Sequence, residues 1–367
     1  MTAALLSVRN LRTTFKTDAG PVRAVDGVSF DVLPGEIFGI VGESGSGKSV
    51  TALSILGLVP QPPAEIEAGE IRWKNTDLRK LSAEELRKIR GDDISMIFQD
   101  PMSSLNPVFT IGQQISDVVR AHTDVSKHEA HDRAIAMLDV VGIPNAKQRV
   151  DDYPHQFSGG MRQRALIAMA IANDPDLIIA DEPTTALDVT IQAQVLEVLQ
   201  KAAATTNSAV VIITHDLGVV AGLVSRVAVM YAGQIVEEGP VESLYYRSRM
   251  PYSWGLMESI ARLDQRRRGR LRPIDGSPPS MLRPPEGCRF HPRCPYRDDA
   301  RCVTTEPELI EIDLDHKARC HYSLDPGWLS PAERMTHPEP HWHNRVLERE
   351  RETARIETAA GAAEGVR

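Results

Sequence analysis

The stretch "EIFGIVGESGSGKS" (residues 36–49) decides how the rest of the chain is interpreted. Its first half is mostly apolar and predicts a buried strand. The second half, "GESGSGKS" (42–49), matches the pattern G-x-x-x-x-G-K-[S/T], a glycine-rich loop whose backbone amides curl around phosphates. The following "KSVTALSILGLV" has helical periodicity. The motif therefore has the strand before it and the helix after it that a phosphate loop requires.

Each residue type in this loop has a chemical role. Lys48 can reach the β and γ phosphates of a nucleotide, and the Ser49 hydroxyl can hold Mg²⁺. The glycines let the backbone approach the phosphates closely. The residues expected to bind the nucleotide here are Gly42, Ser44, Gly45, Gly47, Lys48, Ser49 and Val50.

A second acidic element follows another apolar run. "LIIADE" (177–182) places Asp181 and Glu182 at the carboxyl end of a predicted strand, where open α/β sheets carry their sites. We expect Asp181 to hold Mg²⁺ and Glu182 to orient or deprotonate the attacking water. The chain is thus predicted to hydrolyse a nucleotide.

Composition narrows the class of protein. Hydrophobic residues make up 42% and charged residues 25%, as in ordinary globular proteins. The net charge of −8 argues against nucleic acid as the main partner, because phosphate binding needs a basic surface. No stretch reaches the ~18 apolar residues of a spanning helix, and the N-terminus lacks the features of a secretory signal. These observations predict a cytosolic chain.

The chain divides into regions of different pattern. Short alternating runs up to about residue 35 predict antiparallel strands, and residues 75–170 read as mostly helical. "DLIIADE" (176–182) and "AVVIITHD" (209–216) predict parallel buried strands, and a hairpin is expected to turn at Ala232-Gly233. Composition shifts after about residue 260. We expect a nucleotide-binding domain over 1–260 with a helical part at about 100–170, a Cys-rich domain over 261–330, and a polar tail over 331–367.

Further motifs carry a resemblance to a known family. "FSGGMRQR" (157–164) resembles the signature loop of ATP-binding-cassette ATPases, usually LSGGQ. Phe15, Gln99 in "IFQDP", "TALD" (185–188) ending at Asp188, and His215 in "ITHD" match the family's other motifs in the same order. The resemblance implies an α/β phosphate-loop ATPase with an antiparallel β subdomain and a helical subdomain, here followed by a small Cys-rich C-terminal region.

The resemblance also implies roles for these residues. Phe15 would stack on adenine, Gln99 would sense Mg²⁺ and nucleotide, and His215 would hold the γ-phosphate or the water. Two such ATPases dock head to tail in the family, so Ser158, Gly159 and Gly160 would serve ATP bound on the partner. Asp188 would close the D-loop. Met161 replaces the usual Gln, but the groups expected to bind phosphate remain.

Two segments are similar to a narrower branch. "QDPMSSLNPVFTIGQQI" (99–115) and "EGCRFHPRCPY…CHY" (286–322) resemble the ATPases of oligopeptide and dipeptide importers. This implies a peripheral subunit on the cytoplasmic face of the plasma membrane that powers import of short peptides. Its partners would be a homologous ATPase in a heterodimer, two membrane permease subunits and, indirectly, an extracytoplasmic peptide-binding protein. A nickel or other solute importer, a soluble regulatory or repair ATPase, and an interaction subunit with a dead site are the alternatives.

All four cysteines lie in one short region. Cys288, Cys294, Cys302 and Cys320 can wrap one tetrahedral centre. A zinc site usually has closer Cys pairs, and disulfides fit poorly with a reducing cytosol. A [4Fe–4S] cluster accepts varied spacing, and some members of the importer branch are understood to carry one here. We expect an iron–sulfur cluster that stabilises this region, with zinc and then free thiols as alternatives.

Overall fold

The computed structural model describes residues 3–100, 104–185, 187–259, 274–331 and 333. The chain separates into two compact units, which are described one at a time. The first comprises residues 1–235 and 278–284, and the second comprises residues 236–277 and 285–367. The predicted boundary near residue 260 and nearly all of the predicted tail over 331–367 fall on or beside residues outside the described part.

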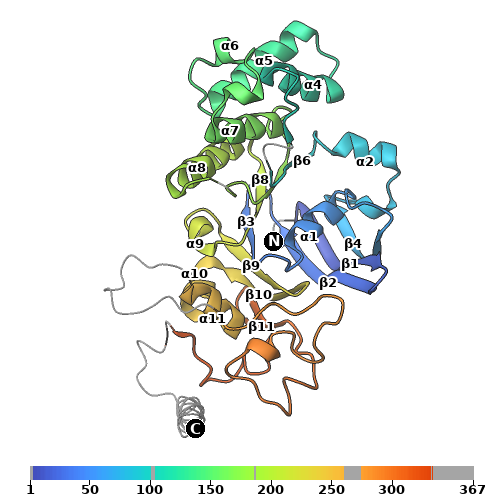
Figure 1. Ribbon diagram of the computed structural model, residues 1–367, viewed down its shortest axis with the longest axis vertical. Helices are drawn as coiled ribbons and strands as arrows, with labels where there is room; N and C mark the ends of the chain where they lie inside the picture. The colour runs from blue at the N-terminus through green and yellow to red at the C-terminus, as the bar shows by residue number, and fades with distance from the viewer. Residues whose placement is uncertain (1–2, 101–103, 186, 260–273, 332, 334–367) are drawn as a thin grey trace, which may run out of the picture. The chain divides into compact units, whose positions relative to one another are not determined.

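The first unit contains two sheets (Figure 1). One is antiparallel, in the order β2-β1-β4-β5, and the other is parallel, in the order β9-β3-β8-β7-β6. The antiparallel strands are β1 (Leu6–Thr17), β2 (Gly20–Val32), β4 (Ala64–Trp73) and β5 (Thr76–Asp77). The parallel strands are β3 (Ile37–Val41), β6 (Ile94–Ile97), β7 (Leu177–Asp181), β8 (Ala209–Thr214) and β9 (Arg226–Tyr231).

The helices of this unit follow the strands in chain order. They are α1 (Lys48–Ile55), η1 (Leu78–Lys80), α2 (Ala83–Ile89), α4 (Ile111–His122), α5 (Lys127–Val140), α6 (Ala146–Arg149), η2 (Pro154–Gln156), α7 (Gly159–Ala170), α8 (Val189–Thr206) and α9 (Leu217–Val220). Figure 1 shows α4, α5, α6 and α7 gathered into one group, which is the predicted helical region.

The core of the parallel sheet explains its sequence pattern. Every residue of β7 and β8 is buried, because helices cover both faces of such a sheet and leave no solvent side for polar residues. The prediction of two buried parallel strands is confirmed. The predicted antiparallel strands near the N-terminus are also confirmed, as β1 and β2, and they contact α1 through a 2.8 Å hydrogen bond between the hydroxyls of Thr13 and Ser54.

One strand departs from the sequence prediction. Residues 94–97 form β6 inside the region that was expected to be mostly helical. The strand is only four residues long, and a short apolar run has no periodicity that separates a strand from a helix. Its pairing with β7, from Ile94 opposite Leu177 to Ile97 opposite Ala180, decides its conformation.

In its described residues, the second unit has short helices and short strands. It contains most of β10 (Gln234–Pro240), followed by α10 (Val241–Arg247), α11 (Pro251–Glu258), η3 (His291–Arg293), β11 (Ile310–Asp313) and β12 (His316–Ala318). β12 pairs antiparallel with both β10 and β11. The predicted turn before β10 is confirmed, since Ala232 and Gly233 both have positive φ, of 46° and 82°.

Candidate functional site

The candidate site lies at one edge of the parallel sheet. β3 leads into the phosphate loop, β7 ends at Asp181, β8 ends one residue before His215, and β6 ends two residues before Gln99. These strands are neighbours in the order β3-β8-β7-β6 and run parallel, so their carboxyl ends meet at the same edge. Motifs far apart in the sequence therefore converge, as open α/β sheets predict.

The phosphate loop is shaped by its glycines and by the strands behind it. Gly45 and Gly47 have φ values of 76° and 103°, a left-handed region that costs other residues strain. A Cβ at Gly47 would collide with the Ala24 carbonyl oxygen, and one at Gly42 with the Met230 carbonyl oxygen. A Cβ at Gly45 would meet open space. The loop therefore lies tightly against β2 and β9 on one side and is open on the other.

Lys48 is held inside the loop. Its Nζ donates to the carbonyl oxygens of Gly42 at 2.8 Å and Glu43 at 3.0 Å, and the side chain is almost fully buried. Burial lowers the pKa of Lys48, while the carboxylates of Glu182, Asp181 and Glu43 act in the opposite direction. A buried ammonium within reach of the loop amides suits the binding of an anionic phosphate.

Ser49 and Asp181 meet beside the lysine, as the prediction of a shared Mg²⁺ site requires. Ser49 Oγ donates to Asp181 Oδ1 at 3.0 Å, although the two residues come from α1 and β7. Burial raises the pKa of Asp181, and the hydrogen bond from Ser49 partly offsets it. A hydroxyl and a buried carboxylate are hard oxygen donors, so this pair fits a magnesium ion.

Three side chains surround the carboxylate of Glu182. Thr185 Oγ1 donates to Oε2 at 2.7 Å, Gln99 Nε2 donates to the same oxygen at 2.8 Å, and His215 Nδ1 lies 3.6 Å from Oε1. Burial would raise the pKa of Glu182, but the hydrogen bond from Thr185 and the nearby His215 and Lys48 outweigh it, and the pKa is lowered. An ionised carboxylate at this position suits a general base.

Two of these contacts were not predicted from the sequence. Gln99, which is expected to sense Mg²⁺ and nucleotide, also donates to Glu182. Thr185 is the first residue of "TALD", and the sequence assigns no role to its side chain. Phe15 lies half-buried in β1, opposite Val22 and Ala64, and Val50 lies in the first turn of α1.

The signature loop (157–164) opens α7. Ser158 is the N-cap of this helix, its Oγ accepts a hydrogen bond from Met161 N at 3.3 Å, and it is exposed together with Gly159. A Cβ at Gly160 would lie 3.0 Å from Ile191, so α7 packs closely against the first turn of α8, whose N-cap is Asp188. The loop thus presents a hydroxyl and a helix N-terminus to the surroundings, an arrangement that favours anions.

The four cysteines line one cavity in the second unit. Its other walls are mostly apolar and include Phe290, Tyr296, Tyr322 and Trp328. Burial raises the pKa of the Cys288 thiol to about 11 and of Cys294 to about 12, and it also raises those of Cys302 and Cys320. Soft sulfur donors gathered in one cavity have the chemistry of a thiolate-bound metal centre. Within the described ranges, however, no three His, Cys, Asp or Glu side chains are spaced to hold a metal ion.

The histidines near these cysteines make other contacts. His291 Nδ1 lies 2.9 Å from the Cys288 carbonyl oxygen, and His321 Nε2 lies 2.9 Å from the Thr305 carbonyl oxygen. His316 is buried and its Nε2 lies 2.9 Å from Glu237 Oε1. His316 is therefore a buried contact between β12 and β10 and is not solvated.

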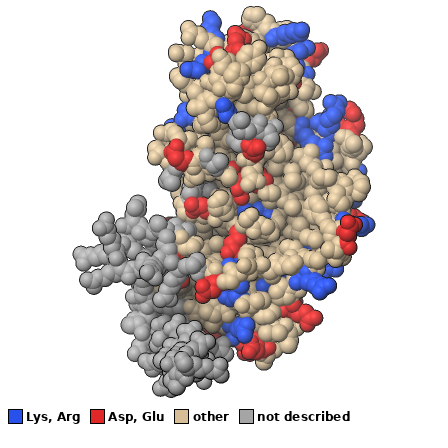
Figure 2. All heavy atoms as spheres, viewed as in Figure 1, with Lys and Arg blue, Asp and Glu red and all other residues tan. Residues whose placement is uncertain are grey.

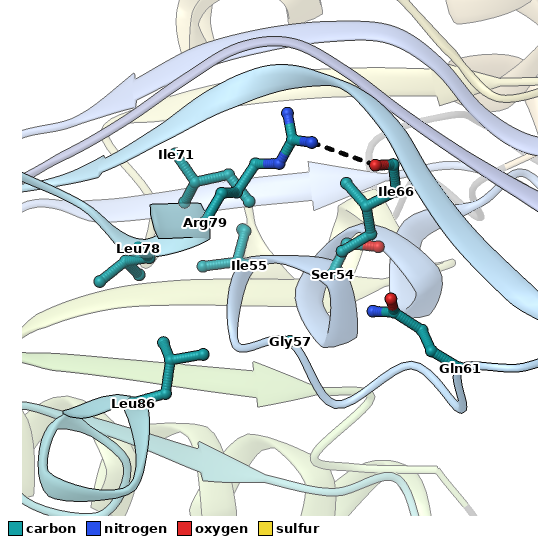
Figure 3. A pocket seen from close by; sticks show the side chains of 9 residues that line it. All are labelled: Ser54, Ile55, Gly57, Gln61, Ile66, Ile71, Leu78, Arg79 and Leu86. Carbon is teal, nitrogen blue, oxygen red and sulfur yellow. Dashed lines mark hydrogen bonds between the residues drawn. The ribbon is translucent and has the colours of Figure 1, made fainter. Parts of the chain in front are cut away.

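A second cavity, of about 230 Å³, lies at the far end of α1 from the phosphate loop (Figure 3). Arg79 borders it, but the guanidinium of this residue donates to the carbonyl oxygens of Gly69 and Ile66. The remaining lining is mostly aliphatic, including Ile55, Ile71 and Leu86. We assign no ligand to this cavity.

The surface and the helices give two further observations. On the face drawn in Figure 2, Lys and Arg side chains are interspersed with Asp and Glu side chains. Of the helices in the described part of the chain, none combines the length and the apolar character needed to cross a membrane.

Each of the two units contains a segment that matches a known family. The family described as "ABC transporter" matches residues 25–185, and the family described as "Oligopeptide/dipeptide transporter, C-terminal region" matches residues 236–302. A solved structure described as the dimeric, post-hydrolysis state of an ATP-binding cassette bound to ADP and Pi is 29% identical, with a TM-score of 0.58. It covers 64% of this chain and 98% of its own.

Individual relatives are closer in sequence. The "Dipeptide transport ATP-binding protein DppD" of Bacillus subtilis (strain 168) is 54% identical over 293 residues, which cover 80% of this chain and 87% of the relative. The "Oligopeptide transport ATP-binding protein OppD" of the same organism is 51% identical, covering 85% and 87% of the two chains. These likenesses agree with the convergence of the motifs at one edge of the sheet. The chain therefore belongs to the ATP-binding-cassette family, as an ATPase of the branch formed by dipeptide and oligopeptide transport ATP-binding proteins.

Proposed function

We propose that this chain hydrolyses ATP to power the import of short peptides through separate membrane subunits. The observation that carries the proposal is the convergence of the phosphate loop, Asp181, Glu182 and His215 at one edge of the sheet. The peptide cargo rests on the relatives, two of which are named for dipeptide and oligopeptide transport. A nickel or other solute importer is the second candidate for the cargo, on the resemblance of the C-terminal segment alone.

The residues of the site have distinct roles in this proposal. Lys48 and the loop amides bind the phosphates, and Phe15 contacts adenine. Ser49 and Asp181 hold Mg²⁺, with Gln99 near the same site, and the ion neutralises phosphate charge when bound. Glu182 takes the proton of the attacking water, and His215 orients the γ-phosphate or that water.

The proposal also includes the domain boundaries. The nucleotide-binding domain would cover residues 1–260, the Cys-rich domain 261–330 and the tail 331–367.

The ATP site is proposed to be completed by a second ATPase subunit. Ser158 and Gly159 are exposed at the N-terminus of α7, where they can contact a phosphate on another chain. Asp188 caps the adjacent helix α8 and would lie at the same interface. The likeness to a dimeric cassette supports this arrangement. We place a homologous ATPase there as the partner, forming a heterodimer.

The membrane partners are proposed from the described residues on either side of Gln99. Phe98, Val108 and Phe109 are large apolar side chains with 44%, 70% and 40% of their surface exposed. Exposed apolar groups in one segment favour a protein interface. Two permease subunits would dock there, which places the chain peripherally on the cytoplasmic face of the plasma membrane. A peptide-binding protein on the other side would deliver the cargo, and no nucleic acid takes part.

The cysteine cavity is proposed to hold a [4Fe–4S] cluster, with zinc as the alternative. The support is the convergence of Cys288, Cys294, Cys302 and Cys320 on one cavity and their soft sulfur donors. A bound centre would offset the cost of burying thiolates, which is what raises the thiol pKa values. Its function would be to stabilise the region around the cysteines, where the described strands and helices are short.

Replacement of the proposed base tests the ATPase function. Glu182→Gln should leave ATP binding unchanged and slow hydrolysis at least ~100-fold, because the amide cannot accept the proton. Binding is measured with a fluorescent nucleotide and hydrolysis by phosphate release, on the full chain assembled with its partner subunits. The matched control is Glu197→Gln, which changes an exposed Glu on α8 that pairs with Lys201. Unchanged hydrolysis in Glu182→Gln would remove this residue from its role.

A further inference from the structure

Among the described residues, the two short hydrogen bonds to the Glu182 carboxylate reach the same oxygen. Oε2 accepts hydrogen bonds from both Thr185 Oγ1, at 2.7 Å, and Gln99 Nε2, at 2.8 Å. Oε1 has a looser neighbour, His215 Nδ1 at 3.6 Å. The two oxygens therefore differ: Oε2 is anchored by two donors, and Oε1 retains the capacity to accept a proton.

The backbone of Glu182 is also fixed. Its φ of 46° lies in the left-handed region, which costs a residue other than glycine about 1 kcal/mol. Glu182 N donates to the Ile213 carbonyl oxygen of β8 at 2.8 Å, and Thr185 N donates to the Glu182 carbonyl oxygen at 3.1 Å. The turn that follows β7 is thus closed on itself, and Thr185 contacts Glu182 through both its amide and its hydroxyl.

A side chain from α8 fastens the other side of this turn. Gln192 Nε2 donates to the carbonyl oxygens of Thr184 at 3.3 Å and Leu187 at 3.1 Å. These two residues flank Thr185 in the chain. A single amide group on a helix therefore holds the backbone on both sides of the threonine whose hydroxyl anchors Glu182.

We infer that Thr185 is a positioning residue for ATP hydrolysis, which fixes Oε2 of Glu182 so that Oε1 accepts the proton of the attacking water. Gln192 acts through Thr185 by holding the turn. The inference rests on the proposed role of Glu182 as base. In the reaction the water oxygen bonds to the γ-phosphorus, the bond to the β–γ bridging oxygen breaks with its electron pair on ADP, and the water proton passes to Oε1. Thr185 and Gln192 contact none of the reacting atoms.

Other charged groups face the same carboxylate and stay constant in the test. Lys48 approaches from α1, Asp181 from the end of β7, and His215 from the residue after β8. Gln99 is neutral and keeps its bond to Oε2. A change seen on removing the Thr185 hydroxyl is therefore due to that hydroxyl.

The decisive variant is Thr185→Val, which keeps the shape of the side chain and removes the donor. We expect kcat to fall about 10- to 100-fold, as for the loss of a hydrogen bond to a charged group, with ATP binding unchanged. The loss should fall on kcat, while the KM for ATP and the affinity for a fluorescent nucleotide stay unchanged. Thr185→Ser keeps the hydroxyl and should restore the rate.

Matched controls lie on the same helix as Gln192. Thr190→Val makes the same substitution at an exposed position of α8, and Gln194→Leu is the exposed counterpart of Gln192→Leu. Both controls should behave as the unmodified chain, whereas Gln192→Leu should lower kcat without changing ATP binding, as Thr185→Val does. All variants are measured in the full chain with its partner subunits.

The outcomes separate this inference from the proposed function. If Thr185→Val keeps the normal rate while Glu182→Gln is inactive, Thr185 does not position the base and the base itself stands. A slower Thr185→Val that also binds ATP more weakly, or that Thr185→Ser does not rescue, would show a structural effect and would also overturn the inference. If Glu182→Gln still hydrolyses ATP normally, the base assignment fails and the inference fails with it.

Discussion

At the scale of single residues, the site is a set of mutually dependent charges. Lys48 and Asp181 are each only 4% exposed, and burial disfavours the charged form of both. Each supports the other's charge, since the lysine lowers the pKa of Asp181 and the carboxylate raises that of Lys48. Removing one hydrogen bond in this group should therefore change the pKa values of the neighbouring groups.

Ser49→Ala should weaken the use of Mg²⁺. The variant loses a hydroxyl ligand and also the hydrogen bond that lowers the pKa of Asp181, so this pKa rises further. Protonation of Asp181 then begins at higher pH, and the defect should deepen as pH falls. We expect the Mg²⁺ concentration for half-maximal hydrolysis to rise about tenfold or more, measured by Mg²⁺ titration at pH values on either side of neutrality.

The control for this variant is Ser54→Ala on the same helix. Ser54 Oγ bonds to Thr13 and to the Val50 carbonyl oxygen, so its loss should lower stability without changing the Mg²⁺ requirement. Equal Mg²⁺ titrations for Ser49→Ala and the unmodified chain would contradict the assignment of Ser49.

The residues with motif positions could be identified from the sequence, and those without could not. Lys48, Ser49 and Asp181 come together as expected, because the strand, loop and helix around them follow from local patterns. No sequence motif or spacing predicts that Thr185 contacts Glu182, or that Gln192 contacts the turn after β7. Their roles depend on how α8 packs after the turn, and this is tertiary information.

At the scale of elements, the site is assembled by strand ends. β3, β8, β7 and β6 are each short and end at the same edge, so the position of each functional residue is set by register. Three of the four strands were predicted: β3 from the apolar run before the phosphate loop, and β7 and β8 from apolar runs ending in acidic or His-containing loops. β6 was not predicted because its four residues lie between a stretch with a helical pattern and a turn-rich segment.

The packing of the phosphate loop on its neighbouring strands predicts different costs for two similar substitutions. Gly47→Ala would place a Cβ against the Ala24 carbonyl oxygen and would also force a residue into φ of 103°. We expect it to lower the free energy of unfolding by about 2–4 kcal/mol. Gly45→Ala meets open space and should cost only about 1 kcal/mol for its backbone conformation.

Chemical denaturation of the full chain, followed by circular dichroism, compares the two variants. The midpoint for Gly47→Ala should lie clearly below that for Gly45→Ala. Coincident midpoints would mean that the loop is not held against β2 as described.

At the scale of the whole molecule, the two units have different sources of stability. The first has two sheets with buried aliphatic cores, whereas the described part of the second has only short strands and short helices. The second contains all four cysteines, gathered around one cavity with aromatic walls. The sequence indicated this contrast, since its composition shifts after about residue 260.

Replacing Cys288 and Cys294 by Ser should therefore loosen the second unit selectively. The native chain should contain iron and sulfide with a broad visible absorption, and the double variant should lose both. Without the centre, residues 285–331 should become sensitive to limited proteolysis while the first unit stays intact, because metal binding contributes folding free energy.

His321→Gln is the control, since His321 lines the cavity but its Nε2 contacts the Thr305 carbonyl oxygen. This variant should retain iron. Zinc without iron in the native chain would favour the alternative metal, and a metal-free, colourless chain would leave the cysteines as free thiols.

The contacts behind the phosphate loop have a consequence for genetics. The nearest atom that a Cβ at Gly42 or Gly47 would meet is a backbone carbonyl oxygen, of Met230 and Ala24 respectively. Every amino acid supplies the same carbonyl, so no substitution at position 24 or 230 creates the room that a larger residue in the loop would need. Loss of either glycine should thus resist rescue by point suppressors at these two neighbours, and revertants should restore the original codon.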